Sequence, residues 1–277
     1  MRRPKGILIP IGGHEDKEGH KSVLARVIKE TGKKNPIIEV ITIATSLPKE
    51  TLADYFEVFH SLGIKKVGDL KVENRKHASD RDIIERVRKC DIAFFSGGNQ
   101  LKLTTMLNGT EFLQVLKERY DEDENFVVAG TSAGASAMAN TMILSGSAID
   151  ALVKGELQLS NGLDFLNNIF IDTHFSERGR FGRLIQTVTT NPPVLGLGLS
   201  EDTAAVIYGG TEMEIVGSGL AVIVDGLEIK YTNLTDVEQG DPITVEGLVM
   251  HVLANGKRFS ITERRSRHEC CSCWSAT

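Results

Sequence analysis

The first two thirds of the chain alternate short apolar runs with segments of helical periodicity, and this alternation constrains the fold more than any other feature. The apolar runs at residues 6–11, 37–44, 91–96 and 126–129 have the length of buried strands. Between them, segments such as 17–30 carry apolar residues at helical spacing. Strands that alternate with helices pair in parallel through right-handed crossovers. The sequence therefore predicts an α/β fold with a mostly parallel sheet flanked by helices.

The pattern changes in the last third, where short β-type runs follow one another too closely to leave room for helices. These runs lie between Gly and Asp turns at residues 194–199, 204–208, 212–216, 220–224, 228–232, 248–253 and 258–262. We expect antiparallel hairpins that complete the sheet. With no internal repeat or low-complexity linker in the sequence, residues 1–263 are predicted to form a single α/β domain with a β-rich C-terminal third.

Residues 264–277 differ from the rest of the chain, because basic residues there are followed by Cys270, Cys271 and Cys273. Three thiols beside a histidine could bind a soft metal, but their spacing matches no structural zinc motif. We therefore expect a disordered Cys-rich tail outside the folded domain. The fourth cysteine, Cys90, ends a helix-like segment and is expected to be a buried thiol.

The charge and hydropathy of the chain argue against several classes of partner. The formal net charge is −5, so no overall positive field would attract nucleic acid or anionic lipid. No apolar stretch approaches the roughly 20 residues that span a bilayer. The apolar run at 6–11 is also too short for a secretory signal. The sequence therefore predicts a cytoplasmic protein that binds neither nucleic acid nor membranes.

A glycine-flanked serine follows the predicted strand at 126–129, in the segment Gly130-Thr131-Ser132-Ala133-Gly134. A strand, a tight turn and a helix form the setting that raises a serine out of a sheet as a nucleophile. The backbone N–H after such a serine faces the place where an oxyanion develops. The segment predicts acyl chemistry on Ser132. A glycine turn before an alanine-rich packing helix is the alternative, since short motifs also arise by chance.

A serine nucleophile needs a general base and an acid that orients it. Among the seven histidines, His174 follows a predicted strand and precedes a dense polar run, which places it at the sheet edge where α/β sites form. Asp172 shares a strand face with His174, whereas Glu201 and Asp202 follow a later strand. The spacing does not choose between these acids, and each could instead cap a turn or a helix.

Two further glycine turns follow predicted strands, namely Ser96-Gly97-Gly98-Asn99-Gln100 and Gly12-Gly13-His14-Glu15-Asp16. Backbone N–H groups in such turns can line an anion or oxyanion pocket, although a plain strand-to-helix connection is the alternative. Arg178, Arg180 and Arg183 follow His174, and guanidinium groups bind carboxylates through paired hydrogen bonds. These arginines favour an anionic substrate, with a solvated basic helix turn as the alternative.

Together these blocks resemble the cyanophycinases, a serine peptidase family that also includes the aspartyl dipeptidases. The resemblance rests on residues 12–13, 96–100, 130–135, 172–184 and 198–204, which occur in order over most of the chain and leave out the tail. It implies a fold similar to the class I glutamine amidotransferases (flavodoxin-like), which usually have a cysteine where this chain has Ser132.

The resemblance implies a catalytic triad of Ser132, His174 and Glu201. It implies oxyanion donors from the backbone of Gly98 or Asn99 and of Ala133. Substrate contacts are implied for Gln100, Asp172, Thr173, Arg178, Arg180, Arg183 and Glu15, with Asp16 as a further acid. Thr173 stands where the family often has glutamine, which concerns one substrate contact and not the triad.

Cyanophycin is a polyaspartate whose side-chain carboxyls carry arginine, and the resemblance implies its cleavage into β-aspartyl-arginine dipeptides. It implies a cytoplasmic enzyme that uses no metal or other cofactor and often forms a homodimer. Two alternatives remain. One is a dipeptidase with the same triad that acts on short aspartyl or isoaspartyl peptides. The other is a protein that only binds an acidic peptide and would need no nucleophile.

Overall fold

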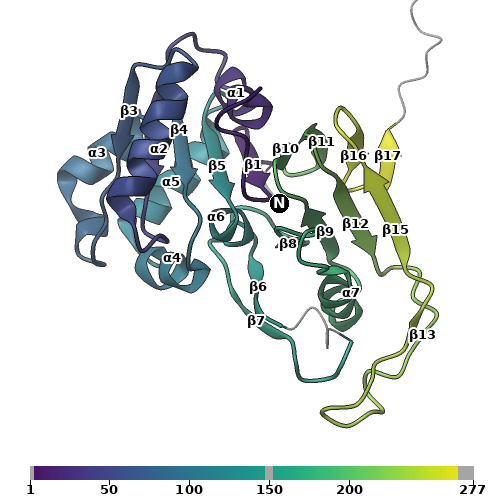
Figure 1. Ribbon diagram of the computed structural model, residues 1–277. Helices are drawn as coiled ribbons and strands as arrows, with labels where there is room; N and C mark the ends of the chain where they lie inside the picture. The colour runs from purple at the N-terminus through teal and green to yellow at the C-terminus, as the bar shows by residue number, and fades with distance from the viewer. Residues whose placement is uncertain (1–2, 147–151, 268–277) are drawn as a thin grey trace, which may run out of the picture.

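A nine-stranded sheet forms the centre of the computed structural model, which describes residues 3–146 and 152–267 (Figure 1). The strand order is β17-β16-β11-β10-β1-β5-β4-β2-β3. The five strands at one end of this order are β1 (Ile7–Ile11), β2 (Ile37–Ile41), β3 (Lys66–Asp69), β4 (Ile92–Phe95) and β5 (Val127–Thr131). These five pair in parallel with one another, as their alternation with helices predicted.

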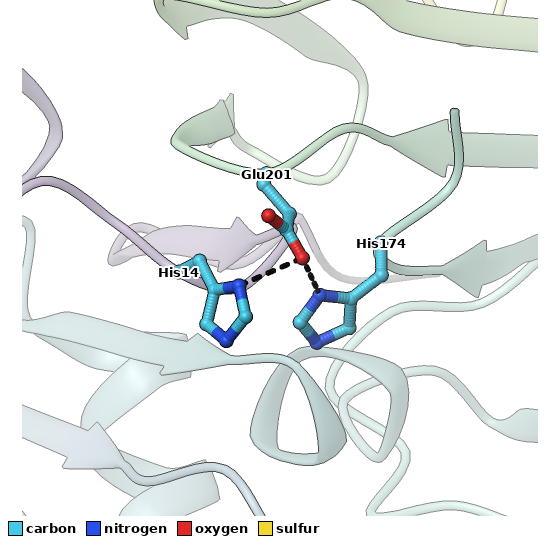
Figure 2. A group of neighbouring side chains, drawn as sticks. All are labelled: His14, His174 and Glu201. Carbon is cyan, nitrogen blue, oxygen red and sulfur yellow. Dashed lines mark hydrogen bonds and ion pairs between the residues drawn. The ribbon is translucent and has the colours of Figure 1, made fainter. Parts of the chain in front are cut away.

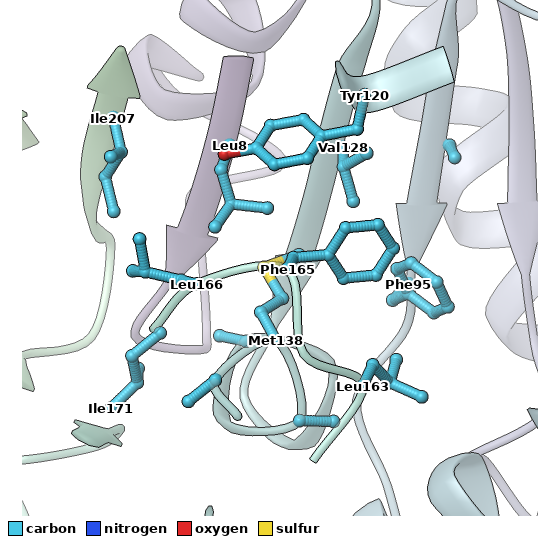
Figure 3. Close-up of a cluster of buried hydrophobic side chains, with 14 of the residues drawn as sticks. Leu8, Phe95, Tyr120, Val128, Met138, Leu163, Phe165, Leu166, Ile171 and Ile207 are labelled. Atoms are coloured by element: carbon cyan, nitrogen blue, oxygen red, sulfur yellow. The ribbon is translucent and has the colours of Figure 1, made fainter. Parts of the chain in front are cut away.

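Helices cover both faces of this parallel half. They are α1 (Ser22–Lys29), α2 (Pro48–Ser61), α3 (Arg81–Lys89), α4 (Gln100–Leu107) and α5 (Glu111–Glu122), with a short 3₁₀ helix η1 at His77–Ser79. Apolar residues of α1 and α2 pack in one buried cluster and those of α3, α4 and α5 in another. Because side chains alternate along a strand, Ile7 and Ile9 enter the first cluster and Leu8 the second, part of which Figure 3 shows.

The other half of the sheet is antiparallel. Beyond β1 lie β10 (Thr203–Tyr208), β11 (Glu212–Gly217), β16 (Arg258–Ser260) and β17 (Arg265–Arg267). Every pairing from β1 to β17 in this direction is antiparallel, so the sheet is mixed rather than mostly parallel. The expectation of a mostly parallel sheet was therefore wrong, because the late hairpins add as many antiparallel pairings as the βαβ units add parallel ones.

A second, four-stranded sheet takes the remaining long strands, in the order β15-β12-β9-β8. Its strands are β8 (Ile169–Asp172), β9 (Leu195–Leu199), β12 (Ala221–Asp225) and β15 (Val249–Leu253). The helix α7 (Phe181–Thr190) connects the parallel pair β8 and β9 and packs on this sheet (Figure 1). The late hairpins therefore do not complete one sheet, since the short turn between β9 and β10 carries the chain from one sheet to the other.

Two small strand pairs complete the described strands: β6 (Thr141–Ser145) with β7 (Gln158–Asn161), and β13 (Tyr231–Thr232) with β14 (Val245–Glu246). Of these four strands, only β13 lies in a run that the sequence pattern indicated, at residues 228–232. The structured chain also runs past residue 263, because β17 pairs with β16. The tail cysteines lie outside the described residues. Cys90 is buried, and burial raises the pKa of its thiol to about 12. Within the described ranges, no helix is both long and apolar enough to cross a membrane.

Candidate active site

A sharp turn at the end of β5 presents Ser132. The chain turns there into the short helix α6 (Ala133–Ser136), and Ser132 adopts φ 52° and ψ −113°, a conformation that residues with side chains rarely adopt. A Cβ on Gly130 would lie 2.9 Å from the Gly134 carbonyl carbon, and one on Gly134 would lie 2.6 Å from the Phe95 carbonyl oxygen. Glycine on both sides therefore allows the close packing that lifts Ser132 out of the strand.

The end of β1 holds the backbone of this region together. Three consecutive carbonyl groups, those of residues 11–13, accept N–H groups from three separate segments: Ser132 to Ile11 (3.0 Å), His174 to Gly12 (2.8 Å) and Asp202 to Gly13 (2.9 Å). A Cβ on Gly13 would lie 2.3 Å from Cε1 of His174, so only glycine leaves room for the imidazole. The glycine turn after the first strand thus positions the site rather than merely connecting two elements.

Ser132, His174 and Glu201 form a hydrogen-bonded chain. Ser132 Oγ lies 2.8 Å from His174 Nε2, and His174 Nδ1 lies 2.7 Å from Glu201 Oε1. His174 comes just after β8, and Glu201 lies in the turn that joins the two sheets. The structure therefore brings together three residues that are far apart in the sequence, in the order of nucleophile, base and acid.

Burial and hydrogen bonding set the protonation states of this chain. Burial lowers the pKa of His174 below its ordinary value of 6.5, although the hydrogen bond to Glu201 opposes this shift. The same hydrogen bond holds the pKa of Glu201 below its ordinary value. At neutral pH His174 is therefore uncharged. Its Nδ1–H donates to the Glu201 carboxylate, and its Nε2 lone pair accepts the Ser132 hydroxyl proton.

Asp172 does not contact His174, so of the two acids Asp172 and Glu201 it is Glu201 that is hydrogen-bonded to the imidazole. The buried Asp172 carboxylate accepts hydrogen bonds from Arg183 Nε (2.8 Å), Arg180 Nη1 (3.2 Å) and the Thr173 N–H (2.9 Å). Two arginines and one carboxylate leave one net positive charge in this cluster. Asp172 is thus neutralised by its own neighbours, which is the arrangement that a buried carboxylate requires.

Two N–H groups are placed to stabilise an oxyanion. A small cavity of about 130 Å³ is lined by Ser132, Ala133 and Gly98. Within the part of the chain that the structure describes, the N–H groups of Ala133 and Gly98 have no hydrogen-bond partner. The Asn99 N–H donates to the Ala44 carbonyl (2.9 Å) and is therefore not free to bind an oxyanion. Of the two candidate donors in this turn, Gly98 is the one whose N–H is available.

Cavities of opposite charge meet at Ser132. The larger, of about 600 Å³, has an excess of acids in its lining, because Glu15, Asp16, Glu18 and Asp54 outnumber the cations Lys17 and Arg178. The smaller is lined by Arg178, Arg180 and Arg183, together with Gln100 and Thr173. Arg178 lines both cavities and has no ion-pair partner among residues 3–146 and 152–267. The side-chain amide of Gln100 donates to the Ile143 carbonyl (2.6 Å), which leaves its oxygen free to accept.

Glu15, which the resemblance implied as a substrate contact, lines the larger cavity but has its carboxylate bound to neighbouring side chains. Its buried carboxylate accepts hydrogen bonds from Thr131 Oγ1 (2.6 Å) and from the Tyr55 hydroxyl (2.5 Å). Thr131 directly precedes Ser132. Both oxygens of Glu15 are therefore engaged in fixing the end of β5.

The sequence analysis missed His14 as part of the site. His14 Nδ1 lies 2.8 Å from Glu201 Oε1, the oxygen that also contacts His174 (Figure 2). The signal was present in the topology: β1 pairs in parallel with β5, so the residues that follow β1 lie beside Ser132. The strand order needed for that argument was not evident from the sequence.

This chain is similar to known peptidases. The family model described as peptidase family S51 matches residues 7–216. A cyanophycinase of Synechococcus elongatus is 32% identical over 266 residues, which cover 96% of this chain and 82% of that protein. A cyanophycinase of Geminocystis herdmanii is 34% identical over 253 residues, covering 91% and 93%.

The fold is also found among solved structures. The crystal structure of a peptidase from an acI-B1 actinobacterium matches with a TM-score of 0.66 at 19% identity, and the match covers 94% of this chain and 98% of that one. At this identity the likeness concerns the α/β fold alone. The family model and the curated relatives carry the assignment: the chain belongs to peptidase family S51 and is a serine-type peptidase related to the cyanophycinases.

Proposed function

We propose that the protein is a cyanophycinase, a serine exopeptidase that releases β-aspartyl-arginine dipeptides from cyanophycin. The observation that carries this proposal is the meeting of an acidic and a basic cavity at Ser132. Each cyanophycin unit carries a guanidinium group and carboxylates, so its two ends need surroundings of opposite charge. The names of the curated relatives support the same substrate.

The charges of the lining residues indicate which cavity would take the guanidinium group of the dipeptide unit and which would take its carboxylates. The substrate guanidinium enters the larger cavity, where Asp54 and Glu18 are the partners, because the carboxylates of Glu15 and Asp16 already accept hydrogen bonds from their own neighbours. The carboxylates face Arg178, whose side chain has no ion-pair partner in the described residues, and the net positive cluster around Asp172. Thr173 lines the same cavity and contributes a hydroxyl where the family often has an amide.

The reaction proceeds through an acyl-enzyme. His174 Nε2 takes the Ser132 hydroxyl proton while Oγ attacks the α-peptide carbonyl of the terminal aspartate. The oxyanion is stabilised by the N–H groups of Gly98 and Ala133. His174 then gives its proton to the leaving amine. A water molecule, deprotonated by His174, hydrolyses the ester and restores Ser132, while Glu201 stabilises the imidazolium in both halves of the reaction.

Incubation with substrates of different length tests the proposal. Purified protein is mixed with insoluble cyanophycin, with aspartyl dipeptides and with isoaspartyl dipeptides, and the products are identified by mass spectrometry. We expect β-aspartyl-arginine from the polymer. Hydrolysis confined to the dipeptides would instead favour the short-peptide dipeptidase, and binding of the polymer without any product would favour the non-enzymatic alternative.

Matched serine variants complete this experiment. Ser132→Ala removes the proposed nucleophile and should abolish product release. Ser61→Ala removes a hydroxyl at the end of α2 that bonds, within the described residues, only to Lys21 and Val58, so the activity of this variant should equal that of the unchanged protein. Equal activity of the two variants would contradict the assignment of Ser132.

Further properties remain proposals that rest on the family relation. The βαβ half of the sheet supports a class I glutamine amidotransferase-like (flavodoxin-like) classification, in which antiparallel strands enlarge the parallel core. We likewise propose a cytoplasmic homodimer. Sedimentation equilibrium of the purified protein tests the dimer, with a mass near 30.3 kDa contradicting it.

A further inference from the structure

Two imidazoles converge on one carboxylate oxygen at the edge of the site (Figure 2). His14 Nδ1 and His174 Nδ1 lie 2.8 Å and 2.7 Å from Glu201 Oε1. The two rings are 5.2 Å apart and stand edge to face. The three side chains come from separate segments, namely the turn after β1, the end of β8 and the turn between β9 and β10. The triad uses one of these imidazoles, so the second has no role in the proposed reaction.

The donor atoms of these residues match the ligand set of a metal site. One ligand atom from each of the three residues lies within 4.8 Å of the others. Two imidazole nitrogens and one carboxylate oxygen are the protein ligands of open, four-coordinate zinc sites, in which water is the fourth ligand. Calcium and magnesium prefer sites made of oxygen ligands alone, so a set that includes two imidazole nitrogens suits zinc better than either of these ions.

Solvent can reach the group, and two of its members can adjust. The side chain of His14 is 74% exposed and that of Glu201 is 28% exposed, whereas His174 is nearly enclosed at 6%. Ligand atoms of a tetrahedral zinc ion lie about 3.3 Å apart, from bond lengths of about 2.0 to 2.1 Å. The two imidazole–carboxylate separations, 2.8 Å and 2.7 Å, therefore need to open by only a fraction of an ångström.

We propose that His14, His174 and Glu201 bind a zinc ion, and that zinc bound there reversibly inactivates the peptidase. The binding half of the proposal rests on the geometry alone. The inactivating half rests on the proposed role of His174 as the base. Zinc is an inhibitor in this account and takes no part in the hydrolysis.

Inactivation follows from the tautomer that zinc imposes on His174. A coordinate bond from Nδ1 needs the lone pair of that atom, so the proton on Nδ1 moves through solvent to Nε2. The Nδ1 proton of His14, which faces the same carboxylate oxygen, moves to its own Nε2 in the same way. Both rings stay neutral, Glu201 is already a carboxylate, and no proton is lost overall. Nε2–H can then only donate to Ser132 and cannot accept its hydroxyl proton. A chelator that removes zinc allows the proton to return to Nδ1, and activity is restored.

Zinc titration of the full-length chain tests the site. Cysteines bind zinc strongly, so the titration uses a background with Cys270→Ser, Cys271→Ser and Cys273→Ser. Calorimetry should give one zinc ion per chain. His14→Ala and Glu201→Gln should each weaken binding by more than about tenfold, since even outer partners of metal ligands contribute that much. The cobalt(II) form should show no thiolate charge-transfer band.

Two variants serve as controls for the ligand set. Ser132→Ala leaves all three ligands in place, and His20→Ala removes an exposed histidine that lies six residues beyond His14. Both should bind zinc as tightly as the background protein. Failure of the background to bind zinc, or unchanged binding in both His14→Ala and Glu201→Gln, would overturn the site.

The inactivating half is read out with a fluorophosphonate probe, which reports the reactivity of Ser132 and needs no peptide substrate. Zinc at saturating concentration should suppress labelling of the background protein, and a chelator should restore it. In His14→Ala, suppression should need more than about tenfold more zinc. Full labelling at saturating zinc would show that the bound ion does not inactivate. Because no cyanophycin is used, this result is independent of the substrate proposal.

Discussion

At the scale of single residues, the site is built from strained backbone. Ser132, His174, His14 and Asp202 all have positive φ, between 44° and 52°, although none is glycine. Such conformations persist only where the surroundings enforce them. Hydrogen bonds hold three of these four residues in place, because Ser132, His174 and Asp202 donate their N–H groups to consecutive carbonyls at the end of β1. The strain is therefore part of how the catalytic groups are aimed.

The role of Glu201 leads to a first prediction. Glu201→Gln keeps the shape of the side chain but loses the charge that stabilises the imidazolium, and the amide can present N–H to Nδ1 and favour the wrong tautomer. We expect turnover of cyanophycin to fall by about 10³ to 10⁴, as for other triads whose acid is disabled. Steady-state kinetics check this. A larger loss from Asp172→Asn would transfer the orienting role to Asp172.

The lowered pKa of His174 leads to a second prediction, on pH dependence. The base works only when uncharged, so activity should fall as the pH drops through the His174 pKa and the ring becomes protonated. Because burial places this pKa below 6.5, activity should persist at pH 6.5 and decline only at lower pH. The pH profile of kcat/KM measures it. A midpoint above 6.5 would mean that the Glu201 interaction outweighs burial.

The sequence supplied Ser132, His174 and Glu201 but not their environment. Ser132 was found from its glycine-flanked turn, which is a local signal. The choice of Glu201 over Asp172 came from family resemblance, because both acids follow a strand end and spacing alone does not separate them. The engagement of Glu15 and of the Asn99 N–H depends on Tyr55 and Ala44, which no local pattern connects with them.

At the scale of elements, the turn after β1 organises the site. Gly12 packs so tightly against the turn between the two sheets that a Cβ would lie 1.9 Å from the Ser200 carbonyl oxygen. The contact holds the turn that carries Glu201 against the end of β1, whose carbonyl groups accept the N–H groups of Ser132 and His174. A single element thus couples the nucleophile, the base and the acid.

Gly12→Ala is therefore the third prediction. The added methyl group must push two backbones apart, and we expect a loss of about 3 kcal/mol of unfolding free energy together with impaired activity. Urea denaturation measures the first quantity. Gly63→Ala is the control: nothing lies within 4 Å of its Cβ, and its φ of 84° alone should lower stability by about 1 to 2 kcal/mol. Equal losses in the two variants would contradict the role of this contact.

The helices and strands themselves were largely predictable, whereas their assembly was not. The helical pattern at residues 17–30 contains α1, and the apolar runs placed most strands within a few residues of their positions. It could not say that β9 and β10, separated by three residues, belong to different sheets, because a strand carries no local mark of its partner. For the same reason the pairing of β17 with β16 was missed.

At the scale of the whole molecule, the active site lies where the two sheets meet. The large sheet supplies Ser132 and the N–H groups for the oxyanion, the small sheet ends at His174, and the turn between them supplies Glu201. The acidic residues of the larger cavity follow β1 or lie on α2, beside the large sheet, whereas the arginines follow β8 of the small sheet. Because the late strands divide between two sheets, an acidic cavity and a basic cavity can lie next to each other at Ser132.

Mapping of a fluorophosphonate adduct tests the central claim, that this arrangement makes Ser132 a nucleophile, most directly. The probe is reacted with the protein at neutral pH, and the modified peptide is located by mass spectrometry. The account predicts one adduct, on the peptide that contains Ser132, strongly reduced in Glu201→Gln and absent in Ser132→Ala. An unlabelled protein, or an adduct on a different serine, would contradict it.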